Sequence, residues 1–487
     1  MDESTDTPVH EVDVIVIGGG PVGENVADRV VKGGLSAALV EARLLGGECS
    51  YYACVPSKAL LRPAAALEGA CTVDGARQAV TGPLDSEAVL ARRTRFTGDW
   101  HDDGQVEWLA GANIDLARGH GRLAGERTVV VDLAAGGTVT IRAERAVVVA
   151  TGTSPLLPPI PGLAEARPWT NREATGADTA PRRLVVLGGG PVACELATAW
   201  RSLGSEEVTL VERGPRLLGR IEPFAAEAVE AGLTAQGVNV WTGASAARVE
   251  RATPGGPVRV HIDGGEGDPV VEADELLVAT GRTPNSSDIG LDTVGLEPGS
   301  WLDADDTGRV TAVPGGWLYA AGDITHEVLL THVGKYQGRA CGDAVVARAR
   351  GELGDGDAEP WGRYAATARH RAVPQVVYTR PEVAAVGLGA DEARSAGIDV
   401  RVVRIPIDVE GAMLHADGYE GTAEMVVDEA RQVMVGVTLV GPDVGEMLHA
   451  ATVAVVGEVP LDRLWHAVPA FPSMSEVWLR LLEAYGL

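Results

Sequence analysis

The chain has 487 residues and a formal net charge of −27 at pH 7, which indicates about three domains and argues against a nucleic-acid or anionic-membrane partner. Only five cysteines occur, which fits a reducing compartment, where a close pair is more often redox-active or metal-binding than structural. The first residues carry no signal-peptide pattern and no apolar run approaches the ~20 residues of a membrane span, so we expect a cytoplasmic protein.

The N-terminal part predicts a βαβ unit. An apolar strand, a glycine turn, a helix and a second strand follow one another over residues 12–41. The turn reads Gly18-x-Gly20-x-x-Gly23, and Glu41 ends the second strand. These glycines permit a tight turn, close approach of a pyrophosphate and close helix packing, and the acid accepts ribose hydroxyls. We therefore expect this unit to bind a dinucleotide.

Two cysteines follow this unit, Cys49 and Cys54. A metal site needs further Cys or His ligands nearby, and none follows. A second interpretation is that both thiols are buried and inert. The third is that the two cysteines form a redox pair. On an ideal helix, residues five apart have Cα atoms about 8.7 Å apart, whereas a disulfide needs less than ~7 Å. A bridge therefore requires an irregular segment, which Gly46, Gly47 and Pro56 permit.

A second unit with the same plan follows a proline-rich linker. Its turn reads Gly188-x-Gly190-x-x-Ala193, and Glu212 is its acid. A carboxylate there accepts hydrogen bonds from the ribose hydroxyls and repels a 2′-phosphate, so we expect NADH to be the substrate. The neighbouring Arg213 could pair with a 2′-phosphate, so NADPH stays an alternative. Two such units predict two dinucleotides, FAD and a nicotinamide. Lysine is rare in this chain, with only three residues, so each lysine position is informative.

The C-terminal part changes character. Strands of an antiparallel sheet and two helices are expected after a polar, glycine-rich loop at residues 351–362. The strands cover 374–388, 399–407 and 423–428, and the helices cover 445–459 and 475–487.

In this order of motifs the chain resembles the flavoprotein disulfide reductases, such as glutathione reductase, dihydrolipoamide dehydrogenase and mercuric reductase. The resemblance covers nearly the whole chain. It is carried by GGECSYYACVPSK at 46–58, ATGTSP at 150–155, ATGRTPN at 279–285, YAAGDIT at 319–325 and YTRPEVAAVGL at 378–388.

The resemblance implies an α/β fold with two Rossmann-like dinucleotide-binding domains and a C-terminal α+β dimerisation domain, in a homodimer. The implied domains are FAD-binding residues 1–165 and 285–360, NAD(P)H-binding residues 166–284 and interface residues 366–487.

The resemblance also implies roles for single residues. NAD(P)H passes a hydride to the flavin, and the flavin passes two electrons to the Cys49–Cys54 disulfide. Cys54 is then the thiol next to the flavin, Cys49 the outer thiol, and Lys58, paired with Glu195, the positive charge near the flavin. No metal is expected. The implied cofactor-binding residues are Gly18, Gly20, Gly23, Glu41, Gly47, Lys58, Gly121, Thr151, Gly152, Asp323, Gly188, Gly190, Ala193, Glu212, Gly281 and Arg282.

The chain departs from the family at its C-terminus. Members that reduce disulfides have His-Pro-Thr-x-x-Glu, whereas this chain has Phe471 in the histidine position and keeps Glu476. A phenyl ring transfers no proton. His466 and the hydroxyls of Tyr51 and Tyr52 are candidate substitutes for this proton transfer. The alternatives are that His466 is an ordinary histidine at a helix end and that the two tyrosine rings only fill the cleft.

Two further departures concern the thiols. Glu48 precedes Cys49 where the family has threonine, and a negative charge there is expected to raise the pKa of the thiol. No cysteine pair of the mercuric or thioredoxin reductase kind follows Glu476.

Three functions remain open. The first is an NADH-dependent reductase of a small-molecule electron acceptor, such as a quinone, working from flavin or dithiol. The second is a dihydrolipoamide-dehydrogenase-type disulfide reductase with a substitute acid. The third is a non-catalytic redox sensor.

Overall fold

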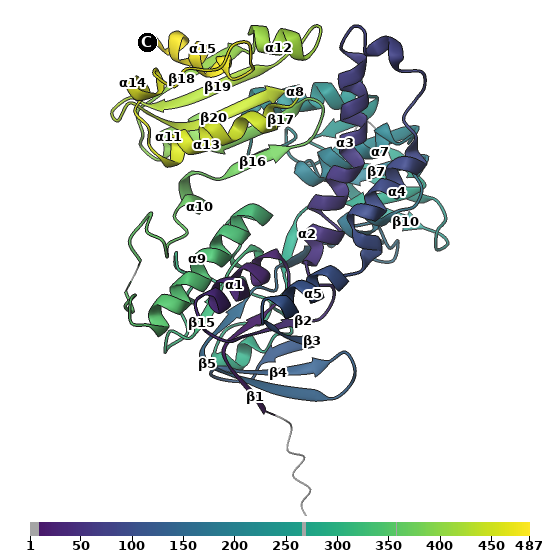
Figure 1. Cartoon of the computed structure of the whole chain (residues 1–487). Helices are drawn as coiled ribbons and strands as arrows, with labels where there is room; N and C mark the ends of the chain where they lie inside the picture. The colour runs from purple at the N-terminus through teal and green to yellow at the C-terminus, as the bar shows by residue number, and fades with distance from the viewer. Residues whose placement is uncertain (1–8, 265–268, 357) are drawn as a thin grey trace, which may run out of the picture. The chain divides into compact units, whose positions relative to one another are not determined.

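The computed structural model describes residues 9–264, 269–356 and 358–487, in two compact units (Figure 1). Residues 1–8, on which the signal-peptide expectation rests, and position 357 of the predicted boundary loop lie outside the described residues. Unit one comprises Met1–Cys54, Thr97–Ser154 and Arg282–Arg369, and unit two comprises Val55–Phe96, Pro155–Gly281 and His370–Leu487.

Unit one is built on a six-stranded sheet in the order β1-β2-β3-β4-β5-β15, in which β1 also pairs with β5. The parallel strands β1 and β2 belong to the predicted βαβ unit, and β3, β4 and β5 form an antiparallel meander. The strands are β1 Val9–Ile17, β2 Ala37–Glu41, β3 Asp115–Leu123, β4 Thr128–Leu133, β5 Thr138–Val149, β6 Thr153–Pro155, β14 Arg282–Pro284 and β15 Leu318–Ala320. The helices are α1 Pro21–Lys32, α2 Gly47–Tyr51, α5 Asp103–Gly111 and α9 Thr331–Ala349, with short 3₁₀ helices at Gly98–Trp100, Leu291–Val294 and Asp323–Thr325.

Helices α1 and α9 pack side by side because glycines line their contact. A Cβ on Gly338 would lie 2.8 Å from the carbonyl oxygen of Val22, and one on Gly342 would lie 2.7 Å from Cβ of Arg29. Real side chains do not tolerate such distances, so the two helix backbones approach closely only with glycine at these positions. The start of α9 is thereby held against the first turn of α1.

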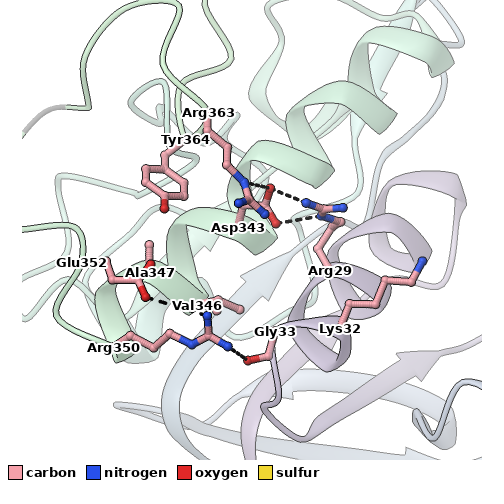
Figure 2. A pocket seen from close by; sticks show the side chains of 10 residues that line it. All are labelled: Arg29, Lys32, Gly33, Asp343, Val346, Ala347, Arg350, Glu352, Arg363 and Tyr364. Carbon is pink, nitrogen blue, oxygen red and sulfur yellow. Dashed lines mark hydrogen bonds and ion pairs between the residues drawn. The ribbon is translucent and has the colours of Figure 1, made fainter.

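Ion pairs tie the other ends of the same helices together (Figure 2). Arg29 donates two hydrogen bonds to the Asp343 carboxylate, at 2.7 and 2.6 Å, and Arg363 donates a third at 3.1 Å. Arg350 donates to the carbonyl oxygen of Gly33 at 2.7 Å, beyond the end of α1. The bidentate geometry fixes the relative rotation of the two helices more firmly than a single contact does.

Unit two contains the second nucleotide-binding sheet, with parallel strands in the order β13-β7-β8-β9. Helix α7 is buried on almost every side, and Trp200 within it is fully buried, so it belongs to the centre of this core. The elements are α3 Cys54–Cys71, a 3₁₀ helix at Arg77–Ala79, α4 Ser86–Phe96, α6 Asn171–Gly176, β7 Arg183–Leu187, α7 Pro191–Ser202, β8 Glu207–Glu212, α8 Pro223–Ala235, β9 Val238–Thr242, β10 Ser245–Arg251, β11 Val258–Asp263, β12 Val270–Ala273 and β13 Glu275–Val278.

The C-terminal part of unit two is a five-stranded antiparallel sheet in the order β16-β17-β20-β19-β18. Every residue of its central strand β20 is buried. Helix α10, Ala368–Arg371, includes the last residues of unit one and the first of this part. The elements that follow it are β16 Pro374–Val377, β17 Glu382–Gly387, α11 Ala390–Ser395, β18 Val400–Pro406, α12 Glu410–His415, β19 Thr422–Asp428, β20 Val433–Gly441, a 3₁₀ helix at Val444–Met447, α13 Leu448–Val456, α14 Leu461–Leu464 and α15 Glu476–Tyr485.

These elements confirm the predicted fold class: two Rossmann-like units followed by an α+β part. In the described ranges, no helix is long and apolar enough to cross a membrane.

Candidate functional site

The first glycine turn, between β1 and α1, leaves space in front of its backbone. Gly18 has φ +110°, and a Cβ there would collide with the carbonyl oxygen of Ala150. A Cβ on Gly23 would collide with the carbonyl oxygen of Gly18, so α1 approaches β1 only without a side chain there. In front of Gly20, by contrast, the nearest atom to a Cβ is Cα of Gly47 at 3.9 Å. This open space at the positive end of a helix fits a pyrophosphate.

The acid of this turn is oriented by backbone groups. The N–H groups of Gly19 and Arg43 donate to the two carboxylate oxygens of Glu41, at 2.7 and 2.6 Å. Burial raises the pKa of Glu41, and these two donors oppose the rise. On the next strand, a Cβ on Gly121 would lie 2.9 Å from a methyl group of Val40, so Gly121 brings β3 close to β2.

A hydrogen-bonded chain joins the second flavin motif to the cysteine segment within unit one. The Thr153 hydroxyl donates to the Asp323 carboxylate at 3.0 Å and accepts from Arg282 Nε at 2.9 Å. Arg282 Nη2 donates to Glu48 at 2.7 Å. Burial raises the pKa of Asp323, whereas Thr153 and Arg282 lower it. Thr153 and the Arg282–Glu48 pair were not predicted, because no local pattern shows which distant segments meet.

The loop after β5 is pinned beside this chain of hydrogen bonds. Asn285 donates from its amide side chain to the carbonyl oxygen of Thr151 at 2.9 Å and from its backbone to that of Gly152 at 3.0 Å. Gly152 has φ +66° and open space where a side chain would stand. The Thr151 hydroxyl is buried, and no described residue hydrogen-bonds to it. An orphaned hydroxyl beside open space fits a site built for a bound polar group.

The cysteine segment is not one regular helix, as the spacing argument requires for a bridge. Helix α2 ends at Tyr51, Tyr52 breaks the helical conformation, and α3 begins at Cys54. Gly46 and Gly47, with φ +94° and +58°, start α2 in left-handed backbone that favours glycine. Cys49 and Cys54 are described as free thiols.

The electrostatic surroundings distinguish the two thiols. Cys54 and then burial raise the pKa of Cys49, whereas Thr331 and Lys335 lower it. The Thr331 hydroxyl lies 3.3 Å from Cys54 Sγ. Glu48, which was expected to raise the thiol pKa, accepts from Arg282 in the ion pair described above, and its effect on the thiol stays a prediction.

The two tyrosines between the cysteines differ in burial. Tyr51 is 2% exposed, and its hydroxyl donates to Gln105 Oε1 at 3.2 Å. Burial raises its pKa to about 12, so it releases a proton less readily than an ordinary tyrosine. The rings of Tyr51 and Tyr52 lie 6.3 Å apart. For Tyr51 these surroundings favour the packing alternative.

The second glycine turn repeats the geometry of the first. Gly188 has φ +113° beside the carbonyl oxygen of Ala279, and Gly190 has no heavy atom within 4 Å of a Cβ. Glu212 accepts from the backbone N–H of Gly214 at 2.5 Å. Arg213 next to it is exposed. The two remaining predicted positions are Ala193, fully buried in α7, and Gly281, with φ +154°.

Lys58 and Glu195 form an ion pair in unit two. Lys58 Nζ donates to Glu195 at 2.6 Å, and the Tyr378 backbone N–H donates to the second carboxylate oxygen at 3.0 Å. Glu195 is 4% exposed. Lys58 also lies 5.1 Å from the centre of the Tyr378 ring. The carboxylate therefore fixes the ammonium group at one place; its role towards a flavin stays a prediction.

The C-terminal residues offer little proton chemistry in the chain as described. Glu476 is buried and accepts from Arg480 at 2.7 Å, while its other oxygen has no described hydrogen-bond donor. Phe471 is 74% exposed. His466 is exposed on the loop after α14, and its role as a substitute base stays a prediction.

The comparisons with known proteins agree on one family. Residues 12–338 match the family "Pyridine nucleotide-disulphide oxidoreductase", and residues 373–481 match its dimerisation domain. Mercuric reductase of Staphylococcus aureus is 29% identical over 96% of this chain and 81% of its own length. Dihydrolipoyl dehydrogenase 3 of Pseudomonas aeruginosa is 32% identical over 96% of both chains.

A solved structure shares the fold. The Cu(II) complex of the HOCl-induced flavoprotein disulfide reductase RclA from Escherichia coli has a TM-score of 0.81 and 24% identity. The match covers 97% of this chain and 99% of that one.

Proposed function

Because the chain belongs to the pyridine nucleotide-disulphide oxidoreductase family, we propose that it takes electrons from NADH, through FAD, to the Cys49–Cys54 pair and on to a small-molecule acceptor. The chain is a flavin-dependent oxidoreductase, and members of this family bind FAD and use NAD(P)H. When bound, FAD accepts a hydride from the nicotinamide and passes an electron pair to a dithiol.

The single observation that carries the proposal is the placement of both thiols in the same compact unit as the first nucleotide turn. Gly47, which faces Gly20 in that turn, is two residues before Cys49. The Thr331 hydroxyl lies 3.3 Å from Cys54 Sγ, where it can donate a hydrogen bond to a thiolate. The dithiol and the nucleotide turn therefore form one local site.

The other residues are assigned roles from their surroundings. Glu41 and Glu212, each held by backbone N–H groups, accept hydrogen bonds from the ribose hydroxyls of FAD and NADH respectively. The Thr153–Asp323 pair orients a hydroxylated chain. Lys58, positioned by Glu195, offers a fixed positive charge that stabilises a reduced, anionic ring system.

We assign FAD binding to residues 1–165 and 285–360, nicotinamide binding to 166–284 and the subunit interface to 366–487. The chain carries the family's dimerisation domain, and exposed apolar side chains in this part, such as Val468 at 85% and Phe471 at 74%, fit a homodimer interface.

Steady-state oxidation of NADH by the wild type and by Cys49→Ser, with a quinone or an aliphatic disulfide as acceptor, tests the proposal. We expect catalytic turnover in the wild type and a loss of more than about 100-fold with the disulfide in Cys49→Ser. NADH consumption that stops at stoichiometric amounts with every acceptor would instead indicate the sensor.

A further inference from the structure

Arg282 was predicted only as a cofactor-binding residue, yet its side chain is tied to the helix that carries Cys49. Its guanidinium makes three hydrogen bonds inside unit one. Nε donates to the Thr153 hydroxyl at 2.9 Å, and Nη2 donates to the Thr153 carbonyl oxygen at 2.8 Å and to the Glu48 carboxylate at 2.7 Å. The Arg282 and Glu48 side chains are 24% and 21% exposed. Because water reaches this pair poorly, salt screens it less than a surface pair.

The acidic partner of this pair belongs to a short helix that needs outside support. Helix α2 has only five residues, and no described side chain caps its start. Isolated helices much shorter than about 12 residues are unstable in water, so contacts with the rest of unit one hold α2 in place. One of these contacts is the ion pair between Glu48 and Arg282, and another is the hydrogen bond from Tyr51 at the other end of the helix.

The same pair determines the charge next to the Cys49 thiol. Glu48 and Cys49 are consecutive residues of α2, with Cα atoms about 3.8 Å apart, so the carboxylate lies within roughly one Debye length of the sulfur, about 10 Å at 0.1 M salt. On its own, this carboxylate disfavours the thiolate, which is the reactive form of a cysteine. Arg282 Nη2 is 2.7 Å from the carboxylate, so its positive charge lies at a similar distance from the sulfur and opposes this effect.

We propose that Arg282 is the positioning residue of the outer thiol: through its ion pair with Glu48 it holds α2 in place and cancels the negative charge beside Cys49, so that Cys49 forms a thiolate although an acidic residue precedes it. This inference rests on the proposed function, in which the Cys49–Cys54 pair passes electrons to the acceptor. Glu48 stands where the chain departs from its family, so the pair is a feature of this chain.

The nearby Asp323 carboxyl supports the opposition of these two charges. Burial raises the pKa of Asp323, whereas among the charged neighbours Arg282 lowers it and Glu48 raises it. The two side chains of the pair therefore act in opposite directions on a third group in unit one. The test leaves unchanged the three other side chains that act on the pKa of the Cys49 thiol, which are Cys54, Thr331 and Lys335.

The test measures the rate at which iodoacetamide alkylates Cys49, as a function of pH. The protein is loaded with FAD, its dithiol is reduced by a phosphine, and tandem mass spectrometry identifies the alkylated cysteine. Arg282→Met, Glu48→Gln and the double variant are compared with the wild type. Arg29→Met and Asp343→Asn are the matched controls, because they remove the same charges from another partly buried ion pair of unit one, near the C-terminal end of α1.

We expect Arg282→Met to slow alkylation near neutral pH about threefold, because the carboxylate left behind raises the thiol pKa. We expect Glu48→Gln to speed alkylation about threefold, because the guanidinium left behind lowers the thiol pKa. The double variant and the controls should stay within about twofold of the wild type. A loss of structure in α2 would instead change the rate in the same direction in both single variants.

The inference is overturned if the two single variants shift the rate in the same direction, or if neither differs from its control. Glu48→Gln keeps the size of the side chain, so it decides the matter even where Arg282→Met does not fold: an unchanged or slower rate in Glu48→Gln overturns the inference by itself. Alkylation needs no turnover. A protein that reacts as expected here, but consumes NADH only in stoichiometric amounts, would therefore identify failure of the proposed function alone.

Discussion

The Lys58–Glu195 ion pair gives a sharp prediction about stability. The Lys58 side chain is 36% exposed, whereas the Glu195 side chain alone is 5% exposed. Lys58→Met therefore leaves a carboxylate buried with only one described neutral donor, the Tyr378 backbone N–H. Loss of one partner of a fully buried pair costs about 3–5 kcal/mol; since Lys58 is partly solvated, we expect about 2–3 kcal/mol.

A double-mutant cycle measures this effect. Urea unfolding at fixed protein concentration and saturating FAD compares the wild type, Lys58→Met, Glu195→Gln and the double variant. Because the double variant has no uncompensated charge, we expect it to recover at least about 1 kcal/mol relative to additivity. Lys32→Met, which removes an exposed lysine, is the matched control, with an expected change below about 0.5 kcal/mol. Additive single effects, or a loss equal to that of the control, would refute the reasoning.

Four further outcomes are expected. Glu212→Ala should lower kcat/KM for NADH about tenfold and raise it for NADPH, and an unchanged ratio would contradict the assigned ribose contact. Burial raises the pKa of Glu382 to about 7, so the folded state holds a proton that the unfolded state loses above its ordinary pKa; this contribution to stability is full at low pH and is lost as pH rises through 7. As pH rises from about 4.5 to 7, the free energy of unfolding of Glu382→Gln should therefore increase relative to that of the wild type by up to about 3 kcal/mol. A difference in thermal stability between the two proteins that stays constant over this pH range would count against this prediction. Gly342→Val should destabilise the α1–α9 contact by about 2 kcal/mol or more, whereas Gly69→Val, with no heavy atom within 4 Å of a Cβ, should change thermal stability by less than about 1 kcal/mol. Phe471→His should change kcat with hydroxyethyl disulfide by less than about threefold if a substitute acid such as His466 already transfers the proton, and a large gain would count against such a substitute.

Local patterns were enough to predict the nucleotide-binding parts. Each glycine turn and its acid lie within about thirty residues, so Gly18–Glu41 and Gly188–Glu212 could be placed from the sequence. The spacing of Cys49 and Cys54 predicted an irregular backbone between them on the condition that they form a bridge, and the structure has such a break at Tyr52.

Strand β20 was missed, although it is the fully buried centre of the C-terminal sheet. Its residues, Val433–Gly441, are mostly apolar and show no alternation with polar residues, and such a run does not distinguish a strand from a buried helix. The predicted strands 374–388, 399–407 and 423–428 surround it in the sheet order.

The contacts around the thiols also could not be predicted from the sequence. Thr331 and Lys335 are more than 270 residues from Cys54 in the chain, and the contact depends on how closely α9 approaches α1. Only the rarity of lysine in the chain drew attention to Lys335.

The most direct test of the account is anaerobic titration of the FAD-loaded protein with NADH, followed by its absorption spectrum. We predict uptake of two electron pairs, one for the flavin and one for the dithiol, with a long-wavelength band appearing after the first. Bleaching complete after one pair, with no such band, would contradict a working Cys49–Cys54 pair and leave the chain as a reductase that acts from its flavin alone.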